Sequence, residues 1–132
     1  MNRKSAIFIA AATLTALLGC APMVPSVPAR LEPWAASASS RSDVRLPEAV
    51  LIHLSTGFVR ALPAQSRWHL VGRLPQGSVY RPMGSVFSIE GQHVHEAYLV
   101  VRQDTLVGFY LPAEQRFSPQ DPAIHLPKGV FE

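Results

Sequence analysis

Residues 94–111 read VHEAYLVVRQDTLVGFYL and give the strongest indication of the fold. It contains two apolar runs, 94–101 and 106–111, which four polar residues separate. Such a short polar break between runs rich in β-branched and aromatic residues fits a tight β-hairpin. Both faces of these runs are partly apolar, so we expect the two strands to lie centrally in a sheet. Gly108 in mid-strand indicates a bulge or a close backbone contact.

Short runs with a period of two continue on both sides of this hairpin. Residues 49–54 form an apolar run, and residues 68–74 alternate between large apolar and other side chains before a turn at 75–77. We expect residues 124–126 to form a short edge strand, residues 57–62 to form the only helical turns, and most aromatic side chains to build the core. The predicted fold is mostly β, a small antiparallel sheet curled into a barrel or sandwich over residues 48–132.

The segment before this domain has a different composition. Residues 20–47 hold five prolines and the small, polar patch AASASS at 35–40. Proline removes amide donors and keeps the chain extended, and the segment has few large side chains to bury besides Trp34. We therefore predict a disordered, Pro-rich tether whose ends lie roughly 25–30 Å apart.

The first twenty residues form a separate unit. Arg3 and Lys4 precede the uncharged run 6–18, which is too short to span a bilayer as a helix. Residues 17–20 read LLGC, which resembles the lipobox of bacterial lipoproteins. The resemblance covers this targeting segment only. It implies that residues 1–19 are a signal peptide, cut before Cys20.

Cys20 is the only cysteine in the chain, so an intramolecular disulfide is impossible. The resemblance implies a diacylglycerol on its thiol and a further acyl group, such as palmitate, on the new amino terminus. Residue 21 is Ala rather than Asp, which by the same resemblance favours the outer membrane over the inner one, with the domain facing the periplasm. The alternative is a secreted protein with an ordinary signal peptide and a free thiol.

Composition gives little support for a nucleic-acid partner or for a transmembrane helix. The whole chain has a net charge of +3, but removal of Arg3 and Lys4 leaves ten basic and nine acidic residues. The charge of the remaining chain is therefore poor evidence for nucleic-acid binding. No second apolar run reaches 18 residues, which predicts no transmembrane helix after the signal peptide.

The sequence carries no catalytic motif that we recognise. It has no Gly-x-Ser-x-Gly and no Gly-rich phosphate loop, and its acids are scattered. We therefore predict no enzyme activity and no cofactor. His93 and His95 are the weak candidates for a metal site, because residues two apart on a strand point to the same side. Glu90, His53 or His69 would supply a third ligand.

The His93-x-His95 pattern invites comparison with cupins, but it departs from their motif. Position 87 is Phe where cupins place Gly, and Glu96 directly follows His95. We therefore do not transfer a metal site, and we expect both histidines to be partly solvated at the end of a strand.

The charges are distributed unevenly along the domain. Residues 49–89 hold four arginines and no acid, namely Arg60, Arg67, Arg73 and Arg81, whereas residues 90–132 hold six acids and three bases. One explanation is cross-strand pairing between the two halves. The other is a bipolar surface that orients the domain on a partner. In a regular strand Arg67 and Arg73 share one solvent-facing side. We therefore take these two, together with Arg60 and Arg81, as the candidate partner surface.

These observations favour an interaction module. We expect a membrane-anchored periplasmic lipoprotein whose β-domain docks on another envelope protein or a cell-wall component as part of an envelope complex. The alternatives are a small metal-binding protein or enzyme that uses His93 and His95, and a module that binds a ligand or the cell wall in a groove of the sheet.

Overall fold

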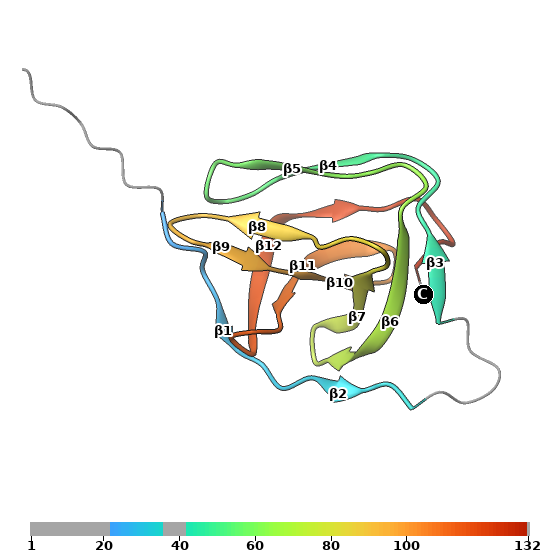
Figure 1. Ribbon diagram of the computed structural model, residues 1–132, viewed down its shortest axis with the longest axis horizontal. Helices are drawn as coiled ribbons and strands as arrows, with labels where there is room; N and C mark the ends of the chain where they lie inside the picture. Colours follow the sequence, from blue (N-terminus) through green and yellow to red (C-terminus); the bar gives the residue numbers. More distant parts are fainter. Residues whose placement is uncertain (1–21, 36–41, 132) are drawn as a thin grey trace, which may run out of the picture.

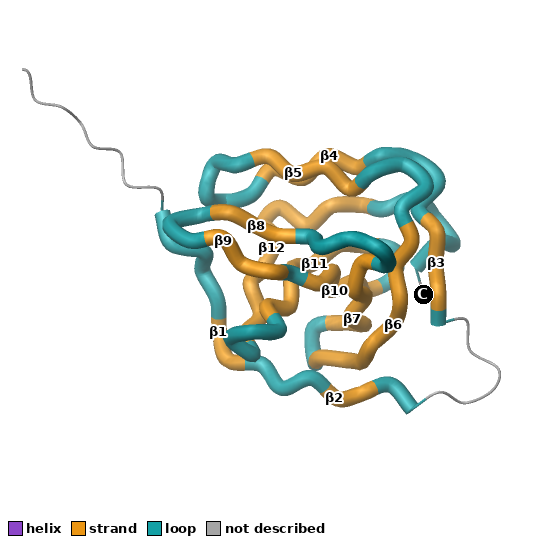
Figure 2. Tube along the Cα trace, viewed as in Figure 1, coloured by secondary structure: helices purple, strands orange, loops and turns teal. Residues whose placement is uncertain are grey.

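A computed structural model describes residues 22–35 and 42–131. Twelve β-strands and no helix occur in these ranges, and the largest sheet curls into a half-barrel (Figures 1 and 2). The prediction of a mostly β fold with an antiparallel sheet is therefore confirmed. No helix in the described ranges is long and apolar enough to cross a membrane.

The largest sheet has eight strands, and all of its pairs are antiparallel. Its order is β1-β12-β11-β10-β7-β6-β2, with β3 also paired to β6. The bounds are β1 Val27–Pro28, β2 Glu32–Pro33, β3 Asp43–Arg45, β6 Arg67–Leu74, β7 Gly77–Pro82, β10 Tyr98–Arg102, β11 Thr105–Leu111 and β12 Arg116–His125. Two separate hairpins complete the fold: β4 Val50–His53 with β5 Val59–Leu62, and β8 Ser88–Glu90 with β9 Val94–Glu96.

The predicted central hairpin is β10–β11. It turns at Gln103 and Asp104, which both have positive φ, as the two-residue turns that match the twist of a hairpin require. The register shifts between Leu106 and Gly108 where β11 pairs with β12. A Cβ on Gly108 would lie 2.3 Å from the Ser118 carbonyl oxygen. The close backbone contact that the sequence predicts at Gly108 is therefore confirmed.

The main core lies inside the half-barrel and packs five aromatic side chains among a larger number of aliphatic ones. The Trp68 and Phe87 rings meet edge to face with centroids 5.9 Å apart, and Phe87 stacks on Phe109 at 6.0 Å. Phe131 packs edge to face on Tyr80 and anchors the end of the described chain in this core. The expectation that most aromatic side chains build the core is confirmed, because all aromatic side chains in residues 48–131 except Phe58 and Tyr98 are buried.

Residues 22–35 differ from the expectation of a disordered tether. We call this segment the N-terminal strap. Its strand β1 pairs with β12 and its strand β2 pairs with β6, so it joins the two opposite edges of the sheet. The Ala29 amide donates to the Gln115 carbonyl and the Trp34 amide donates to the Val71 carbonyl, both at 3.1 Å. The strap runs along one side of the sheet from β12 to β6, at the bottom of the view in Figure 1.

The strap is ordered because it covers a second, smaller core on the other side of the sheet. Ala29 and Leu31 pack against a buried cluster of five side chains, which are Leu74, Val79, Val100, Tyr110 and Phe117. Proline is compatible with this position, since an edge strand leaves part of its amides unpaired. The missing side chain of Gly72 makes room, because a Cβ there would lie 2.3 Å from the Glu32 carbonyl oxygen.

Three further expectations change in the structure. Residues 57–62 form a turn and strand β5 rather than helical turns, because they pair with β4 from Val50↔Leu62 to His53↔Val59. The paired region begins well before residue 48, since the strap and β3 belong to the sheet. Residues 124 and 125 are the end of the long strand β12 rather than a separate edge strand. The signal peptide, Cys20 and most of the patch 35–40 lie outside the described residues.

Candidate functional site

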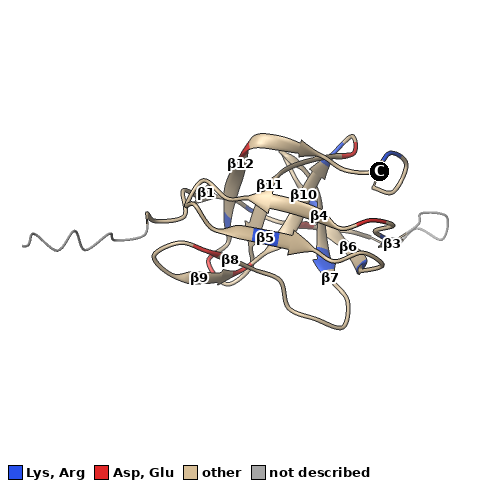
Figure 3. Ribbon diagram, turned by 90° about the horizontal axis from the view of Figure 1, so that it is seen from above, with Lys and Arg blue, Asp and Glu red and all other residues tan. Residues whose placement is uncertain are grey.

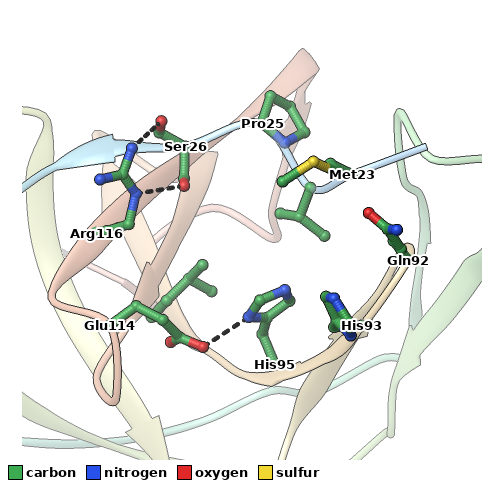
Figure 4. Close-up of a pocket in the computed structure, with 10 residues that line it drawn as sticks. Met23, Pro25, Ser26, Gln92, His93, His95, Glu114 and Arg116 are labelled. Carbon is green, nitrogen blue, oxygen red and sulfur yellow. Dashed lines mark hydrogen bonds and ion pairs between the residues drawn. The ribbon is translucent and has the colours of Figure 1, made fainter.

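A cavity of about 440 Å³ lies between the strap, strand β9 and the turn that leads into β12 (Figure 4). Its volume is in the range that holds small molecules in other proteins. One wall is apolar and comes from the strap and β11, and the other is polar. The lining residues are Met23, Val24, Pro25, Ser26, Gln92, His93, His95, Leu111, Glu114 and Arg116.

His95 and Glu114 form the best-defined polar pair in this cavity. His95 lies on β9, and its Nδ1 is 2.7 Å from Oε1 of Glu114 in the β11–β12 turn. A carboxylate at Nδ1 favours a proton there, which leaves Nε2 of the neutral ring as an acceptor. Figure 4 shows this second nitrogen turned away from Glu114. The pair therefore offers an oriented imidazole to a molecule in the cavity.

The two histidines singled out in the sequence line this same cavity, as a spacing of two on a strand predicts. The third ligands considered for them lie elsewhere. Glu90 pairs with Arg60, and His69 pairs with Asp43. Across the described residues, no group of three or more His, Cys, Asp or Glu side chains is arranged to hold a metal ion.

Arg116 lines the cavity but is occupied in holding the strap. Its Nε donates to Ser26 Oγ and its Nη2 donates to the Ser26 carbonyl oxygen, both at 2.7 Å. These two hydrogen bonds hold the strap against the start of β12, directly after the β11–β12 turn. Sequence reasoning missed Glu114 and Arg116, because each is an isolated charge in a turn region and nothing in the pattern places it opposite residues 23–26.

Two of the four candidate arginines have local partners. The Arg60 guanidinium is 3.4 Å from the Glu90 carboxylate and 5.5 Å from the centre of the Phe87 ring. Arg73 stands opposite Glu32 in the β2–β6 ladder and 5.8 Å from the centre of the Trp34 ring. The Arg60–Glu90 pair is the cross-half pairing that the charge distribution suggested.

Arg67 and Arg73 do not form one continuous strip, which corrects the expectation for a regular strand. The register of β6 against β7 shifts between Leu70 and Gly72. As a result, Val71 and Leu74 both pack against the second core although they are an odd number of residues apart. The bulge thus changes the side to which the later side chains of β6 point, and it separates Arg73 from Arg67.

Arg67 and Arg81 instead share a surface with Arg45 of β3. Arg45 is the direct partner of Arg67 in the β3–β6 ladder, and Arg81 is the partner of His69 in the β6–β7 ladder. Residues opposite one another in an antiparallel pair lie on the same face. We call these three exposed arginines the arginine surface. The acid on this face of the three strands, Asp43, is paired with His69.

Comparison with models of protein families, with curated proteins and with solved structures finds no match for this chain.

Proposed function

We propose that this protein is a lipid-anchored envelope lipoprotein whose β-domain docks, through its arginine surface, on an acidic face of another envelope protein. The lipobox-like residues 17–20 support the anchor, and Ala21 supports the outer membrane as its location. The observation that carries the docking function is the grouping of Arg45, Arg67 and Arg81 on three neighbouring strands.

This grouping is unfavourable for the isolated domain. Like charges directly opposite one another in a sheet, as Arg45 and Arg67 are, destabilise it. No ion pair with an acid is seen for any of the three arginines among the described residues. An acidic partner surface would relieve this repulsion, so the charges favour association over isolation. Because all three side chains are exposed, the attraction acts over a Debye length of about 8 Å and weakens with salt.

The test uses the full lipidated protein, extracted in mild detergent with its bound partner. Reversing two charges by Arg67→Glu together with Arg81→Glu should lower the yield of co-purified partner about tenfold at low salt. Exposed charge contacts contribute up to about 1 kcal/mol each, and 1.4 kcal/mol corresponds to a factor of ten. The difference from wild type should shrink at high salt.

The matched control is Arg30→Glu together with Arg102→Glu. These two arginines are also exposed, and the pair reverses the same amount of charge away from the arginine surface. We expect its partner yield to stay within about twofold of wild type, since exposed charges without a partner contribute little. Equal yields from both double variants, with both folded by circular dichroism, would refute docking through the arginine surface. Loss of binding to isolated cell wall, with protein capture unchanged, would assign the surface to cell-wall carboxylates instead.

A further inference from the structure

Three segments gather at the end of the molecule where the described chain begins: residues 22–24, 54–59 and 90–94 (Figures 1 and 3). The Gln92 amide donates to the Pro22 carbonyl oxygen at 3.0 Å, and the Thr56 hydroxyl donates to the Glu90 carbonyl oxygen. The strap, the β4–β5 turn and the β8–β9 turn are therefore joined. We call these three segments the anchor end.

The anchor end exposes large apolar side chains and carries almost no charge. Met23 is 72% exposed, Val94 is 69% exposed and Phe58 is 38% exposed. Glu90 is the one charged residue in the three segments, and its carboxylate is half-buried and paired with Arg60. Leu51 and Val59 extend the exposed apolar surface along the outward face of the β4–β5 hairpin. Such neutral, apolar loops are unusual at the surface of a domain without an interaction there.

The anchor end is also tied closely to the residue that would carry the lipid. Cys20 precedes Pro22 by two residues, and two residues span at most about 7 Å. The strap cannot lengthen the connection between Cys20 and the domain while Pro22 is hydrogen-bonded to Gln92 and Ser26 is hydrogen-bonded to Arg116. A lipid on Cys20 would therefore hold this end of the domain directly at the bilayer surface, instead of at the distance that a flexible tether would allow.

We propose that the anchor end lies in the interfacial layer of the bilayer that the acyl chains of Cys20 enter, with Met23, Phe58 and Val94 in contact with lipid. This inference rests on the lipid anchor of the proposed function. The occupant is a neutral lipid surface, because the anchor end has no exposed cation to recruit anionic headgroups. The contact should therefore form on phosphatidylcholine and should be insensitive to salt.

The experiment measures whether position 94 touches lipid in the full lipidated protein. Val94→Trp is reconstituted into phosphatidylcholine vesicles whose acyl chains carry bromine, which quenches tryptophan fluorescence on contact. Val86→Trp is the matched control, since Val86 is 74% exposed but precedes β8. It lies four residues before Glu90, which is roughly 13 Å if the chain is extended. The wild type gives the background from Trp34 and Trp68.

We expect the fluorescence added by Val94→Trp to fall by more than half in brominated vesicles, at both low and high salt. The fluorescence added by Val86→Trp should stay within about a tenth of its value in unbrominated vesicles. Flotation of the vesicles reports the anchor separately. A protein that fails to float has no lipid anchor, which would overturn both the proposed function and this inference. A protein that floats while its Val94→Trp signal is unquenched keeps its anchor and overturns the lipid contact alone, as expected if a protein or a second copy covers this end.

Discussion

The anchor end and the arginine surface have opposite surface chemistry. The anchor end exposes Met23, Phe58 and Val94 and holds a single, paired carboxylate. The arginine surface places three exposed guanidinium groups on adjacent strands, with Asp43 paired to His69 between them. Figure 1 shows β3 and the anchor end on opposite sides of the molecule. Surface polarity in this domain therefore differs between its two spatial ends and does not follow the two halves of its sequence.

The largest expected effect comes from removing the proposed lipid anchor. Cys20→Ser deletes the only thiol, so incorporation of radioactive palmitate should fall to background. Because two or more acyl chains give firm anchoring at about 0.8 kcal/mol per buried methylene, the variant should remain an uncleaved precursor or leave the membrane fraction. The measurement is the palmitate label together with membrane fractionation. Equal label in variant and wild type would end the lipoprotein interpretation.

The smallest expected effect concerns His93, in the anchor end, and His95, directly beside it. His93→Ala with His95→Ala removes one exposed ring and one half-buried pair with Glu114, which contributes at most about 1 kcal/mol. We expect partner capture to change less than twofold and the melting temperature to fall by only a few degrees. Metal analysis of the purified wild-type protein provides the check. One zinc or copper per chain, lost in this double variant, would contradict the prediction and restore the metal-binding alternative.

Local patterns in the sequence were enough to predict much of the fold. The β10–β11 hairpin follows from two apolar runs around a polar break, and Gly108 was recognisable because glycine is costly in mid-strand unless something needs its space. The burial of most aromatic side chains follows from their hydrophobicity alone. These features depend on residues that are close in sequence or on a property of one residue, which is why no structure was needed.

The strap and the candidate site could not be predicted in the same way. Prolines at residues 22–33 are typical of a tether, and only the second core beneath Ala29 and Leu31 shows why the segment is ordered. The arginine surface needs Arg45, which lies before the expected domain, and excludes Arg73 because of the bulge in β6. The His95–Glu114 pair joins residues that are 19 positions apart, with strands β10 and β11 between them in the sequence. Long-range register decides each of these contacts, and a single sequence does not record it.

Amide hydrogen exchange in the full protein tests the central claim, that the strap is part of the fold and ties the anchor to the domain. The amides of Ala29 and Trp34 donate to the carbonyls of Gln115 and Val71, on which the strap depends. We predict that both amides exchange nearly as slowly as those of β6 and β12, to which the strap pairs. Exchange of both at the rate of an unstructured peptide, with β10 and β11 still protected, would show that residues 22–35 are a flexible tether and would contradict the claim.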